Sequence, residues 1–359
     1  MRIVVAGGGT AGHVSPAIAL ARALPNDDVT FIGTEAGVEA TMVPAAGFSM
    51  QRIKVAGFDR ARPAAFPAVA GRAAGAVVSA RRILGDIRPN VVVGMGGYVS
   101  LPVSLAAASR RIPLVLHEQN IVFGLAHRVT KPFARRVAVS FQETLEGAGA
   151  KGVWTGNPVM PELVDADLMA ERPRAVATFD LDPARRTVLV FGGSLGAKTV
   201  TDAAFGLAQE WSDRGDVQVL HILGRRGTDV PAPATADLLY RTVPYVERMV
   251  EAYAIADVAV CRGGASTVAE LTVIGVPSVI VPYPYHRDRQ QERHARVLEA
   301  AGASEVLLDR DTTPSALAAM LNRLLADDGR RAEMSEAARS LARPDAAQEL
   351  ASIVRTVAK

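Results

Sequence analysis

The sequence predicts an α/β protein made of two Rossmann-like domains, each built on a doubly wound parallel sheet and the two facing a cleft. Three observations lead to this fold class. The chain has 359 residues, which is long for one hydrophobic core. Apolar runs of strand length recur, each followed by a turn signal and a helix-like stretch. The two halves also share a weak internal repeat, so each half is expected to form its own sheet.

The expected strands are the buried apolar runs. In the first half they are Ile3–Ala6, Val29–Ile32, Val91–Val93, Pro113–Leu116 and Arg136–Val139. In the second half they are Val188–Phe191, Val217–Ile222, Val258–Val260 and Ser278–Val281. In both halves, apolar strands run into similar glycine loops. Val5–Thr10 matches Val190–Leu195, and Val91–Gly97 matches Val258–Gly264. The charged, proline-punctuated stretch Pro158–Pro183 is expected to link the halves.

Composition favours a globular enzyme. Hydrophobic residues make up 49% and charged residues 21% of the chain, with no low-complexity tract. Cys261 is the only cysteine, so it forms no internal disulfide, and without clustered histidines it makes no zinc site. The apolar run at the N-terminus ends at Gly7 and is too short for the core of a signal peptide. No apolar run approaches the ~18 residues that span a bilayer. We therefore expect a cytoplasmic protein that can still rest on a membrane.

Positive charge is concentrated in the first half. Residues 1–157 carry 17 Lys and Arg against 9 Asp and Glu, a net +8 within a chain of net charge +3. A solvated, arginine-rich surface is one interpretation of this excess, and contact with anionic lipid is another. Nucleic acid is not expected, because the basic segment 52–88 lacks the interleaved aromatic residues of a single-strand binder.

The first glycine loop, Gly7–Gly12, follows an expected strand and opens a helix. Backbone N–H groups in such a loop approach phosphate closely, and the helix N-terminus adds a favourable dipole. The loop also fits the G-x-G-x-x-G pattern of dinucleotide enzymes, with Glu35 placed where an acid would bind ribose. His13 argues against that interpretation, because a dinucleotide fold needs close helix packing there. From the sequence, structural and catalytic roles for His13 are equally open.

In the second half, Arg262–Glu270 places small residues and hydroxyls at a helix start. Ser266 and Glu270 share a helix face, so the carboxylate can accept ribose hydroxyls while the helix start binds phosphate. A capped helix with a solvated glutamate is the alternative. Gln290 and Gln291 follow a buried strand and offer amides suited to sugar hydroxyls, although paired glutamines are commonly surface residues.

Two polar segments follow expected strands of the first half, Gly96–Ser100 and His117–Asn120. Together with His13 they supply the groups that acid–base chemistry on a hydroxyl requires. Asp165 and Asp167 form a D-x-D pattern that resembles a metal-binding motif. We expect no metal there, because the pattern lies in the linker and no nearby residues complete an oxygen-rich shell.

Taken together, these motifs resemble the MurG family, the bacterial UDP-N-acetylglucosamine:undecaprenyl-diphospho-muramoylpentapeptide N-acetylglucosaminyltransferases of the GT-B fold. The resemblance spans nearly the whole chain. It rests on seven ordered motifs: Gly8–His13, Gly96–Ser100, His117–Asn120, Gly156–Val159, Gly192–Ala197, Gly263–Glu270 and Asp288–Gln291. It implies an N-terminal acceptor domain on the membrane side, residues 1–159, and a C-terminal donor domain, residues 160–339. It also implies a C-terminal helix, about residues 340–359, that crosses back onto the N-terminal domain.

By this resemblance the C-terminal domain holds the donor, UDP-N-acetylglucosamine, with the uracil near the backbone of Val246 and the ribose on Glu270. Ser194 and Thr267 lie near the diphosphate. The implied donor-binding residues are Thr10, Ala11, Gly12, Asn120, Ser194, Val246, Gly264, Ala265, Ser266, Thr267, Glu270, Gln290 and Gln291. The implied acceptor-binding residues are His13, Gly96, Gly97, Tyr98, Glu118 and Asn120.

The implied reaction is a single in-line displacement. The 4-hydroxyl of the muramoyl sugar of lipid I, undecaprenyl-diphospho-MurNAc-pentapeptide, attacks the anomeric carbon as UDP leaves, which inverts that centre and gives lipid II for peptidoglycan synthesis. His13 is the first choice of general base because an ordinary pKa of about 6.5 suits proton abstraction near neutral pH, and Glu118 is the second. No metal or other cofactor is expected, since backbone N–H groups and a helix dipole can stabilise the departing diphosphate.

The implied acceptor carries a long lipid chain, so the enzyme is expected at the cytoplasmic face of the bacterial plasma membrane, bound peripherally to its anionic surface. One expected helix carries arginines among apolar residues and can rest at headgroup level. The residues concerned are Phe66, Val69, Arg72, Val77, Val78, Arg81, Arg82, Ile83 and Leu84. Packing of the same apolar face against the sheet is the alternative.

Two positions depart from the family pattern. Met160 stands where the family commonly has an arginine, and Thr201 where it commonly has an asparagine. Lys198 is a neighbouring cation able to replace the missing charge. The rival functions are another GT-B transferase or a UDP-N-acetylglucosamine epimerase, an NAD-dependent oxidoreductase based on Gly7–Gly12, and a membrane-peripheral scaffold without turnover.

Overall fold

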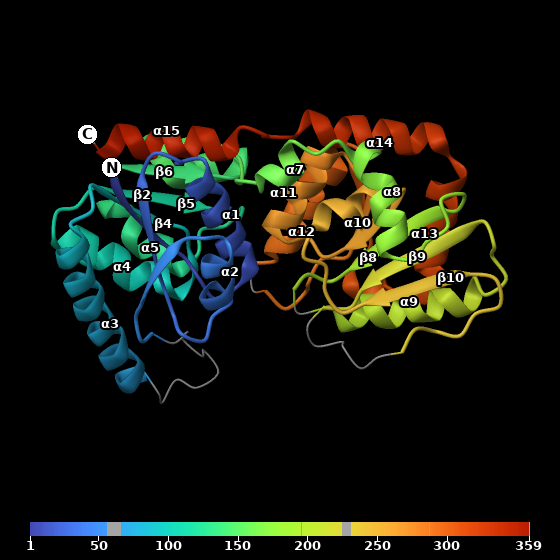
Figure 1. Cartoon of the computed structure of the whole chain (residues 1–359), viewed down its shortest axis with the longest axis horizontal. Coiled ribbons are helices and arrows are strands. Elements are labelled where there is room, and N and C mark those ends of the chain that lie inside the picture. The colour runs from blue at the N-terminus through green and yellow to red at the C-terminus, as the bar shows by residue number, and fades with distance from the viewer. Residues whose placement is uncertain (56–65, 195, 225–230, 287, 359) are drawn as a thin grey trace. The chain divides into compact units, whose positions relative to one another are not determined.

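The computed structural model describes residues 1–55, 66–194, 196–224, 231–286 and 288–358, the side chains of residues 66–73 excepted. Contacts within the chain divide it into two compact units. Unit 1 comprises Met1–Met160 and Arg343–Lys359, and unit 2 comprises Pro161–Ala342. Each unit is a parallel sheet with helices packed on it (Figure 1), which confirms the predicted class of two Rossmann-like α/β domains. No helix in the described part of the chain has the length and apolarity needed to cross a bilayer.

Unit 1 contains a seven-stranded parallel sheet in the order β3-β2-β1-β4-β5-β6-β7. Its strands are β1 (Arg2–Ala6), β2 (Asp28–Gly33), β3 (Ser49–Arg52), β4 (Val91–Gly94), β5 (Leu114–Glu118), β6 (Arg136–Val139) and β7 (Gly152–Trp154). The strand order reverses between β1 and β4. In open α/β sheets, ligands bind beyond the carboxyl ends of the strands at such a reversal.

Strand β1 shows how the layers of unit 1 form. Ile3 and Val5 point to one face of the sheet and Val4 and Ala6 to the other, and all four are fully buried. A parallel strand covered on both faces has to be apolar on both, which explains the continuous apolar run. The first face packs on α1 (Ala11–Arg22), α2 (Glu39–Ala45) and α15 (Ala346–Ala358). The second packs on α3 (Phe66–Ile87), α4 (Gly97–Ser109) and α6 (Leu145–Ala148).

Helix α15 belongs to unit 1 although it comes last in the chain (Figure 1). Its buried residues Leu350, Ala351 and Val354 lie on one face of the helix and join the core formed by α1 and the sheet. At its end, Arg355 binds Asp27 at 3.0 Å. The C-terminal segment is therefore part of the N-terminal core.

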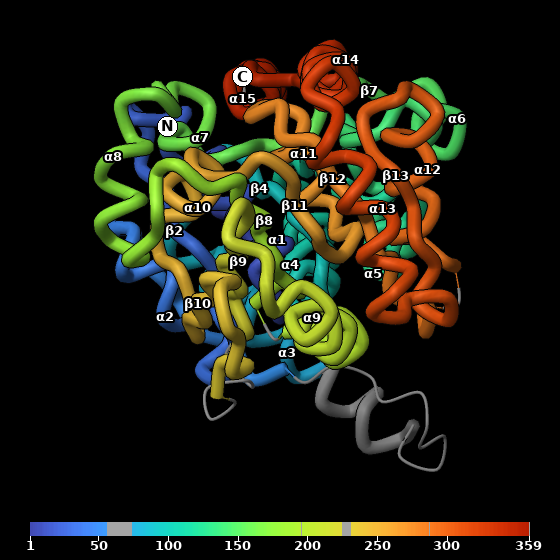
Figure 2. Tube along the Cα trace, turned by 90° about the vertical axis from the view of Figure 1, so that its right-hand side faces the viewer, coloured from blue at the N-terminus to red at the C-terminus, as the bar shows by residue number. Residues whose placement is uncertain are grey.

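Unit 2 contains a six-stranded parallel sheet in the order β10-β9-β8-β11-β12-β13. Its strands are β8 (Arg186–Phe191), β9 (Val217–Ile222), β10 (Leu239–Val243), β11 (Val258–Cys261), β12 (Ser278–Ile280) and β13 (Ser304–Val306). Val188 and Val190 of β8 pack with α9 (Lys198–Glu210) and α13 (Pro314–Ala326), which lie together in Figure 2. On the opposite face, Phe191 contacts α10 (Met249–Ile255).

The other described helices complete the two units. In unit 1 they are α5 (Leu125–Thr130) and the 3-10 turns η2 (Lys131–Phe133), η3 (Gln142–Thr144) and η4 (Gly149–Lys151). In unit 2 they are α7 (Pro161–Val164), α8 (Leu168–Thr178), α11 (Ala265–Ile274), α12 (Gln290–Ala300), α14 (Asp328–Ser340) and η5 (Asp309–Asp311).

The interpretation of Pro158–Pro183 as a linker was wrong. Most of this stretch folds into unit 2 as α7 and α8, and α8 packs along α10. Asp167 is the N-cap of α8, where one carboxylate oxygen accepts the N–H groups of Met169 and Ala170, each at 3.1 Å. The D-x-D pattern is therefore a helix start.

Candidate active site

In unit 1 the loops that follow β1 and β4 meet at the carboxyl edge of the sheet. These strands are neighbours, and β5 lies next to β4. Gly97 has a φ of +73°, and a Cβ at this position would lie 2.2 Å from the carbonyl oxygen of Gly8. A Cβ on Gly96 would lie 3.1 Å from the ring of His13. The glycines of the second motif therefore allow the two loops to touch and leave room for the imidazole.

The ring of His13 is oriented by Gln119. The amide nitrogen of Gln119 donates to the carbonyl oxygen of Met95 at 2.8 Å, which turns the amide oxygen toward His13. Nδ1 of His13 lies 3.1 Å from that oxygen and donates to it. The neutral ring therefore carries its proton on Nδ1 and presents Nε2 as an acceptor. Gln119 lay inside a predicted motif but was not predicted to have this role.

The surroundings of His13 favour its neutral form. Burial lowers its pKa, and this outweighs the charge of Glu118 and the hydrogen bond to Gln119, which raise it. A neutral imidazole at pH 7 can accept a proton from a hydroxyl. Tyr98 belongs to the same cluster, because its ring would lie 2.8 Å from a Cβ on Gly9. The structure thus brings together the predicted residues His13, Gly96, Gly97 and Tyr98.

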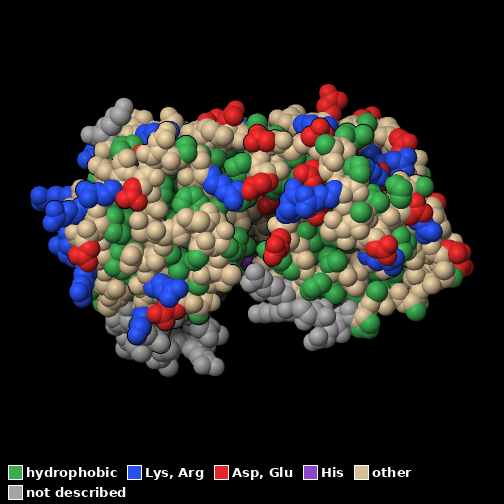
Figure 3. All heavy atoms as spheres, viewed as in Figure 1, with side chains coloured by type: hydrophobic (Ala, Val, Ile, Leu, Met, Phe, Trp, Pro, Cys, Tyr) green, Lys and Arg blue, Asp and Glu red, His purple; other side chains and the backbone are tan. Residues whose placement is uncertain are grey.

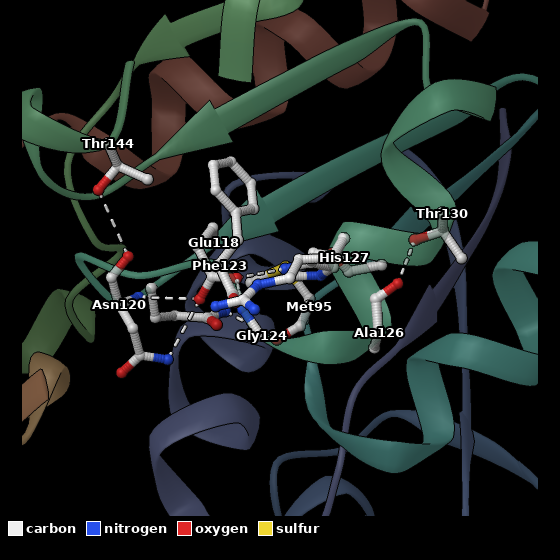
Figure 4. Close-up of polar contacts among 12 residues, drawn as sticks. Met95, Glu118, Asn120, Phe123, Gly124, Ala126, His127, Thr130 and Thr144 are labelled. Carbon is white, nitrogen blue, oxygen red and sulfur yellow. Dashed lines mark hydrogen bonds and ion pairs between the residues drawn. The ribbon is translucent and has the colours of Figure 1, made fainter. Parts of the chain in front are cut away.

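Glu118, the second choice of base, is surrounded by donors (Figure 4). Its Oε1 accepts the backbone N–H of Asn120 at 3.1 Å and the side-chain amide of Asn120 at 3.2 Å. Its Oε2 accepts the N–H of Gly124 at 2.9 Å and Nδ1 of His127 at 2.8 Å. Burial raises the pKa of Glu118, but His127 and these hydrogen bonds outweigh it and hold the pKa at about 2.

This geometry corrects the expectation for Glu118. A general base needs a lone pair directed at the substrate and a pKa near the working pH, and Glu118 has neither. Its carboxylate instead orients the amide of Asn120 and ties α5 to the end of β5. Asn120 is therefore the group of this pair that remains available to a ligand, through its amide oxygen.

His127 is a buried site residue that the sequence did not reveal. Its Nδ1 faces Glu118, and its Nε2 lies 3.2 Å from the carbonyl oxygen of Gly94. Both ring nitrogens thus face acceptors. It lies nine residues after Glu118 in a short helix and belongs to no motif, so only the folded contact identifies it.

The first glycine loop is not an open phosphate site. Glu39 of α2 is buried, and its Oε2 accepts the N–H of Gly9 at 3.0 Å. Its Oε1 accepts the N–H of Thr34 at 3.0 Å and the Thr34 hydroxyl at 2.7 Å. A buried carboxylate at this point repels a pyrophosphate and uses one of the loop's donors. Glu35, the acid of the dinucleotide interpretation, is exposed, so the structure disfavours that interpretation.

In unit 2, α11 begins without a side-chain cap. Its N-cap is Gly264, which has no side chain to bond the first-turn N–H groups. Gly263 packs against the start of α12, because a Cβ there would lie 2.6 Å from the carbonyl oxygen of Gln291. Nδ1 of His294 donates to the carbonyl oxygen of Gly263 at 2.9 Å. The starts of α11 and α12 therefore adjoin, which brings the predicted residues Gly264, Ala265, Ser266 and Thr267 close to Gln290 and Gln291.

Glu270 lies one turn into α11 and is partly buried. The hydroxyl of Tyr253 donates to its Oε2 at 2.8 Å. Burial raises the pKa of Glu270 to about 7, while the bond from Tyr253 lowers it. The other predicted donor residues, Ser194 after β8 and Val246 after β10, follow strands of the same parallel sheet and so lie at the same carboxyl edge.

One of the two hydrogen-bonding groups of the Gln291 side chain is already bonded within the protein. Its amide oxygen accepts the N–H of Tyr283 at 3.0 Å, which leaves the amide nitrogen as the group that can donate to a sugar. Arg262, from the same loop cluster, is buried and donates to the carbonyl oxygens of Val281 at 3.1 Å and Pro282 at 3.3 Å. This arginine therefore supports the loop after β12.

The two departures from the family pattern have structural explanations. Met160 packs on the core of unit 1 that includes α15. Thr201 places its hydroxyl 3.4 Å from Nε2 of His221, a buried histidine that also contacts Tyr240. Lys198 is paired with Asp202 one turn along α9, so its charge is already partly neutralised. The structure gives no support for Lys198 as a substitute cation.

Comparison with known proteins identifies the family. The glycosyltransferase family 28 N-terminal domain matches residues 3–139, and the family 28 C-terminal domain matches residues 187–350. A UDP-N-acetylglucosamine--N-acetylmuramyl-(pentapeptide) pyrophosphoryl-undecaprenol N-acetylglucosamine transferase of Nocardioides sp. is 42% identical, over 99% of this chain and 97% of its own. The enzyme of the same name from Salinibacter ruber is 41% identical, over 99% of this chain and 96% of its own. The chain belongs to glycosyltransferase family 28, in its MurG branch.

Solved structures agree with this family. The crystal structure of Acinetobacter baumannii MurG is 27% identical, with a TM-score of 0.74 and 99% of each chain covered. The calicheamicin glycosyltransferase CalG4 is 18% identical with a TM-score of 0.70, over 99% of this chain and 97% of its own, and supports the fold alone. Family 28 membership confirms that the chain is a glycosyltransferase of the GT-B fold. The role of each site residue remains a prediction.

Proposed function

We propose that the chain transfers N-acetylglucosamine from UDP-N-acetylglucosamine to the 4-hydroxyl of the muramoyl sugar of lipid I, which makes lipid II for peptidoglycan synthesis. The substrate pair is supported by full-length relatives that are named for it. The observation that carries the chemistry is His13, which Gln119 holds with its proton on Nδ1 and its Nε2 as the acceptor.

The donor is assigned to unit 2. The start of α11 suits the diphosphate, because its N-cap is a glycine with no competing side chain and the positive end of the helix dipole attracts an anion. Glu270, one turn further, accepts the ribose hydroxyls. The amide groups of Gln290 and Gln291 bind the sugar, and the backbone at Val246 binds the uracil. The diphosphate leaves as an anion that α11 stabilises without a metal.

The acceptor is assigned to unit 1. The muramoyl 4-hydroxyl gives its proton to Nε2 of His13 while its oxygen forms a bond to the anomeric carbon. The bond from that carbon to the UDP oxygen breaks at the same time, and UDP leaves with the electron pair. Because attack and departure occur on opposite sides of the carbon, its configuration inverts. Tyr98 and the amide oxygen of Asn120 are the nearby groups that can orient the acceptor sugar.

The decisive experiment measures transfer from labelled UDP-N-acetylglucosamine to a short-chain lipid I analogue. His13→Ala should lower kcat by ~10² to 10⁴, as expected for loss of a general base, and leave the Kd for UDP unchanged. Activity of the parent should persist in EDTA. If His13→Ala keeps a near-normal kcat from pH 6 to 9, or if the parent shows no transfer, the proposed function fails.

The proposed contact with an anionic membrane needs a different surface from the one first expected. Of the predicted apolar residues on α3, Leu84 is buried and Val77 and Ile83 pack on the core with it, while Val78 is exposed. The apolar face of α3 therefore packs inside unit 1 at these residues, which agrees with the alternative interpretation that this face packs against the sheet. Phe66, Val69 and Arg72 lie outside the described side chains.

A better membrane surface lies on α5 and η2. Leu125, Val129 and Phe133 recur every fourth residue and are 54%, 43% and 54% exposed. Basic residues Arg128, Lys131, Arg135 and Arg136 lie among and just after them, and Arg81 and Arg82 are exposed on α3. Figure 3 shows Arg and Lys side chains gathered at the end of unit 1 that carries α3. Apolar side chains among cations match an anionic bilayer surface, where each cation contributes ~1 kcal/mol.

Vesicle co-sedimentation tests this surface. Val129→Glu with Phe133→Glu should reduce binding to anionic vesicles, and salt should weaken the binding of the parent. Met169→Glu is the matched control, because Met169 is an equally apolar, 80% exposed residue of unit 2. Equal binding of the double variant and the parent would place the membrane contact elsewhere.

A further inference from the structure

Glu270 is held by a buried tyrosine to which no function has been assigned. Tyr253 lies on α10 and is 1% exposed. Its hydroxyl donates to Oε2 of Glu270 at 2.8 Å. Its ring meets the ring of Phe191 edge-on, with 6.0 Å between ring centroids. Phe191 ends β8 and leads into the Gly192 loop, so the phenol is fixed between that loop and α11.

The other titratable groups around α11 do not replace the phenol. Burial raises the pKa of the Cys261 thiol on β11, which keeps it neutral. On the helices packed against α11, His294 donates to the carbonyl oxygen of Gly263, Arg339 donates to that of Ile274, and Glu162 is exposed. Among the described residues, the phenol is the hydrogen-bond donor placed on the Glu270 carboxylate.

We propose that Tyr253 is a positioning residue for the donor nucleotide, which orients the Glu270 carboxylate so that its remaining lone pairs accept the ribose hydroxyls. The proposal rests on the assignment of Glu270 to the ribose. A carboxylate turns freely about its last bond, and a donor fixed on one oxygen sets the direction of the other. The same bond favours the ionised form, which is the form that accepts two hydroxyl protons.

The proposal has a specific consequence for Tyr253→Phe. Without the phenol hydroxyl, the pKa of Glu270 rises further, so more of the site is protonated at pH 7. The affinity for UDP should fall on the order of tenfold at pH 7, the usual effect of losing a hydrogen bond to a charged group. At pH 9 Glu270 ionises again, so the part of the loss that is due to its protonation should be recovered, whereas the part that is due to the lost orientation should persist.

The experiment measures binding of UDP and of 2′-deoxy-UDP to the full-length protein by titration calorimetry at pH 7 and pH 9. In Tyr253→Phe the preference for UDP over 2′-deoxy-UDP should shrink, because the lost contact is at the ribose hydroxyls. Tyr240→Phe is the matched control. It removes another buried phenol hydroxyl of unit 2, which bonds His221 at 2.8 Å, and should leave the preference unchanged.

Two outcomes would overturn the proposal. Equal loss of affinity for both nucleotides, without recovery at pH 9, would make Tyr253 a purely structural residue. Unchanged UDP binding in Tyr253→Phe, with strong loss in Glu270→Gln, would refute the role of Tyr253 and leave the assignment of Glu270 to the ribose intact. Unchanged UDP binding in Glu270→Gln would instead refute the assignment of Glu270 to the ribose. If Tyr253→Phe lowers the melting temperature, comparing the nucleotide affinities of the variant at pH 7 and pH 9 still separates a positioning role from a purely structural one.

Discussion

At the scale of single residues, the chemistry of His13 depends on one amide. Gln119 bonds both Met95 and His13, so its oxygen is committed to Nδ1. Gln119→Glu would place a carboxylate opposite Nδ1 and raise the pKa of His13. Because the base must be neutral, the acidic limb of the kcat profile should move to higher pH, with reduced kcat at pH 7 and recovery near pH 9.

The matched change for this prediction is Gln119→Leu, which removes the acceptor without adding charge. It should lower kcat about tenfold or more by freeing the ring, without shifting the pH profile. Measurement of kcat from pH 6 to 9 for both variants separates orientation from charge. Identical profiles for the Glu and Leu variants would contradict the tautomer assigned to His13.

Residue chemistry could be predicted from the sequence where the partners lay in motifs that follow neighbouring strands. The first two glycine motifs and His13 do meet at one edge of the sheet, as strand order requires. Glu118 is unsuited to act as a base because it is bonded to His127, and the first glycine loop is not open to phosphate because Gly9 is bonded to Glu39. Both partners come from other helices and carry no pattern of their own, so no reading along the chain could have shown that these groups were already bonded.

At the scale of elements, the expected strands and the missed strands differ in position within the sheets. The four missed strands, β3, β7, β10 and β13, are the edge strands of their sheets. Most of their residues are partly or fully exposed. Central parallel strands are buried on both faces and read as apolar runs, whereas an edge strand has no such requirement. Apolar periodicity therefore predicts the centre of each sheet and not its edges.

Helix α15 is an element whose contribution can be measured. Leu350 is fully buried in the core of unit 1, and Ser352, two residues along the same helix, is exposed. Leu350→Ala should lower the free energy of unfolding of unit 1 by about 2 to 5 kcal/mol through lost burial and the cavity left behind. Denaturant titration of a Trp211→Phe background, in which Trp154 reports unit 1, gives the value. Ser352→Ala is the control, and an equal effect of both changes would mean that α15 does not belong to the core of unit 1.

At the scale of the whole molecule, the sequence predicted two α/β units because each half repeats the strand, glycine loop and helix pattern. It did not predict how the chain joins them, because α7 and α8 look like a charged linker until α8 packs on α10. An amphipathic helix with few apolar residues is stabilised mainly by packing against a neighbouring element, which cannot be read from its own sequence. The two units also carry different buried titratable groups, so their stabilities should respond differently to acid.

In unit 1, buried groups resist protonation. Burial lowers the pKa of His117 to about 4, and that of His13 shifts in the same direction. In the unfolded chain His117 takes up a proton as the pH falls through about 6.5. The unfolded state therefore binds more protons between pH 6.5 and 4, and unit 1 loses stability as the pH falls through this range. At pH 5 the loss due to His117 is about 2 kcal/mol.

In unit 2, two groups oppose each other over the same range. Burial lowers the pKa of His221 to about 4, so its contribution to stability is lost as the pH falls below about 6.5. Burial raises the pKa of Glu270 to about 7, so the folded state binds the extra proton between the ordinary glutamate value and pH 7. The Glu270 contribution therefore grows as the pH falls. The two effects offset each other, and the stability of unit 2 should change little between pH 7 and pH 5.

The two tryptophans of the chain allow this contrast to be tested, because Trp154 lies in unit 1 and Trp211 in unit 2. Urea titrations of Trp211→Phe and Trp154→Phe follow units 1 and 2 separately at pH 7 and pH 5. Acidification should lower the midpoint of unit 1 and leave that of unit 2 nearly unchanged. Adding His117→Gln should remove much of the pH dependence of unit 1, since a glutamine does not titrate. A larger acid shift in unit 2 than in unit 1 would contradict the assignment of these pKa shifts to burial.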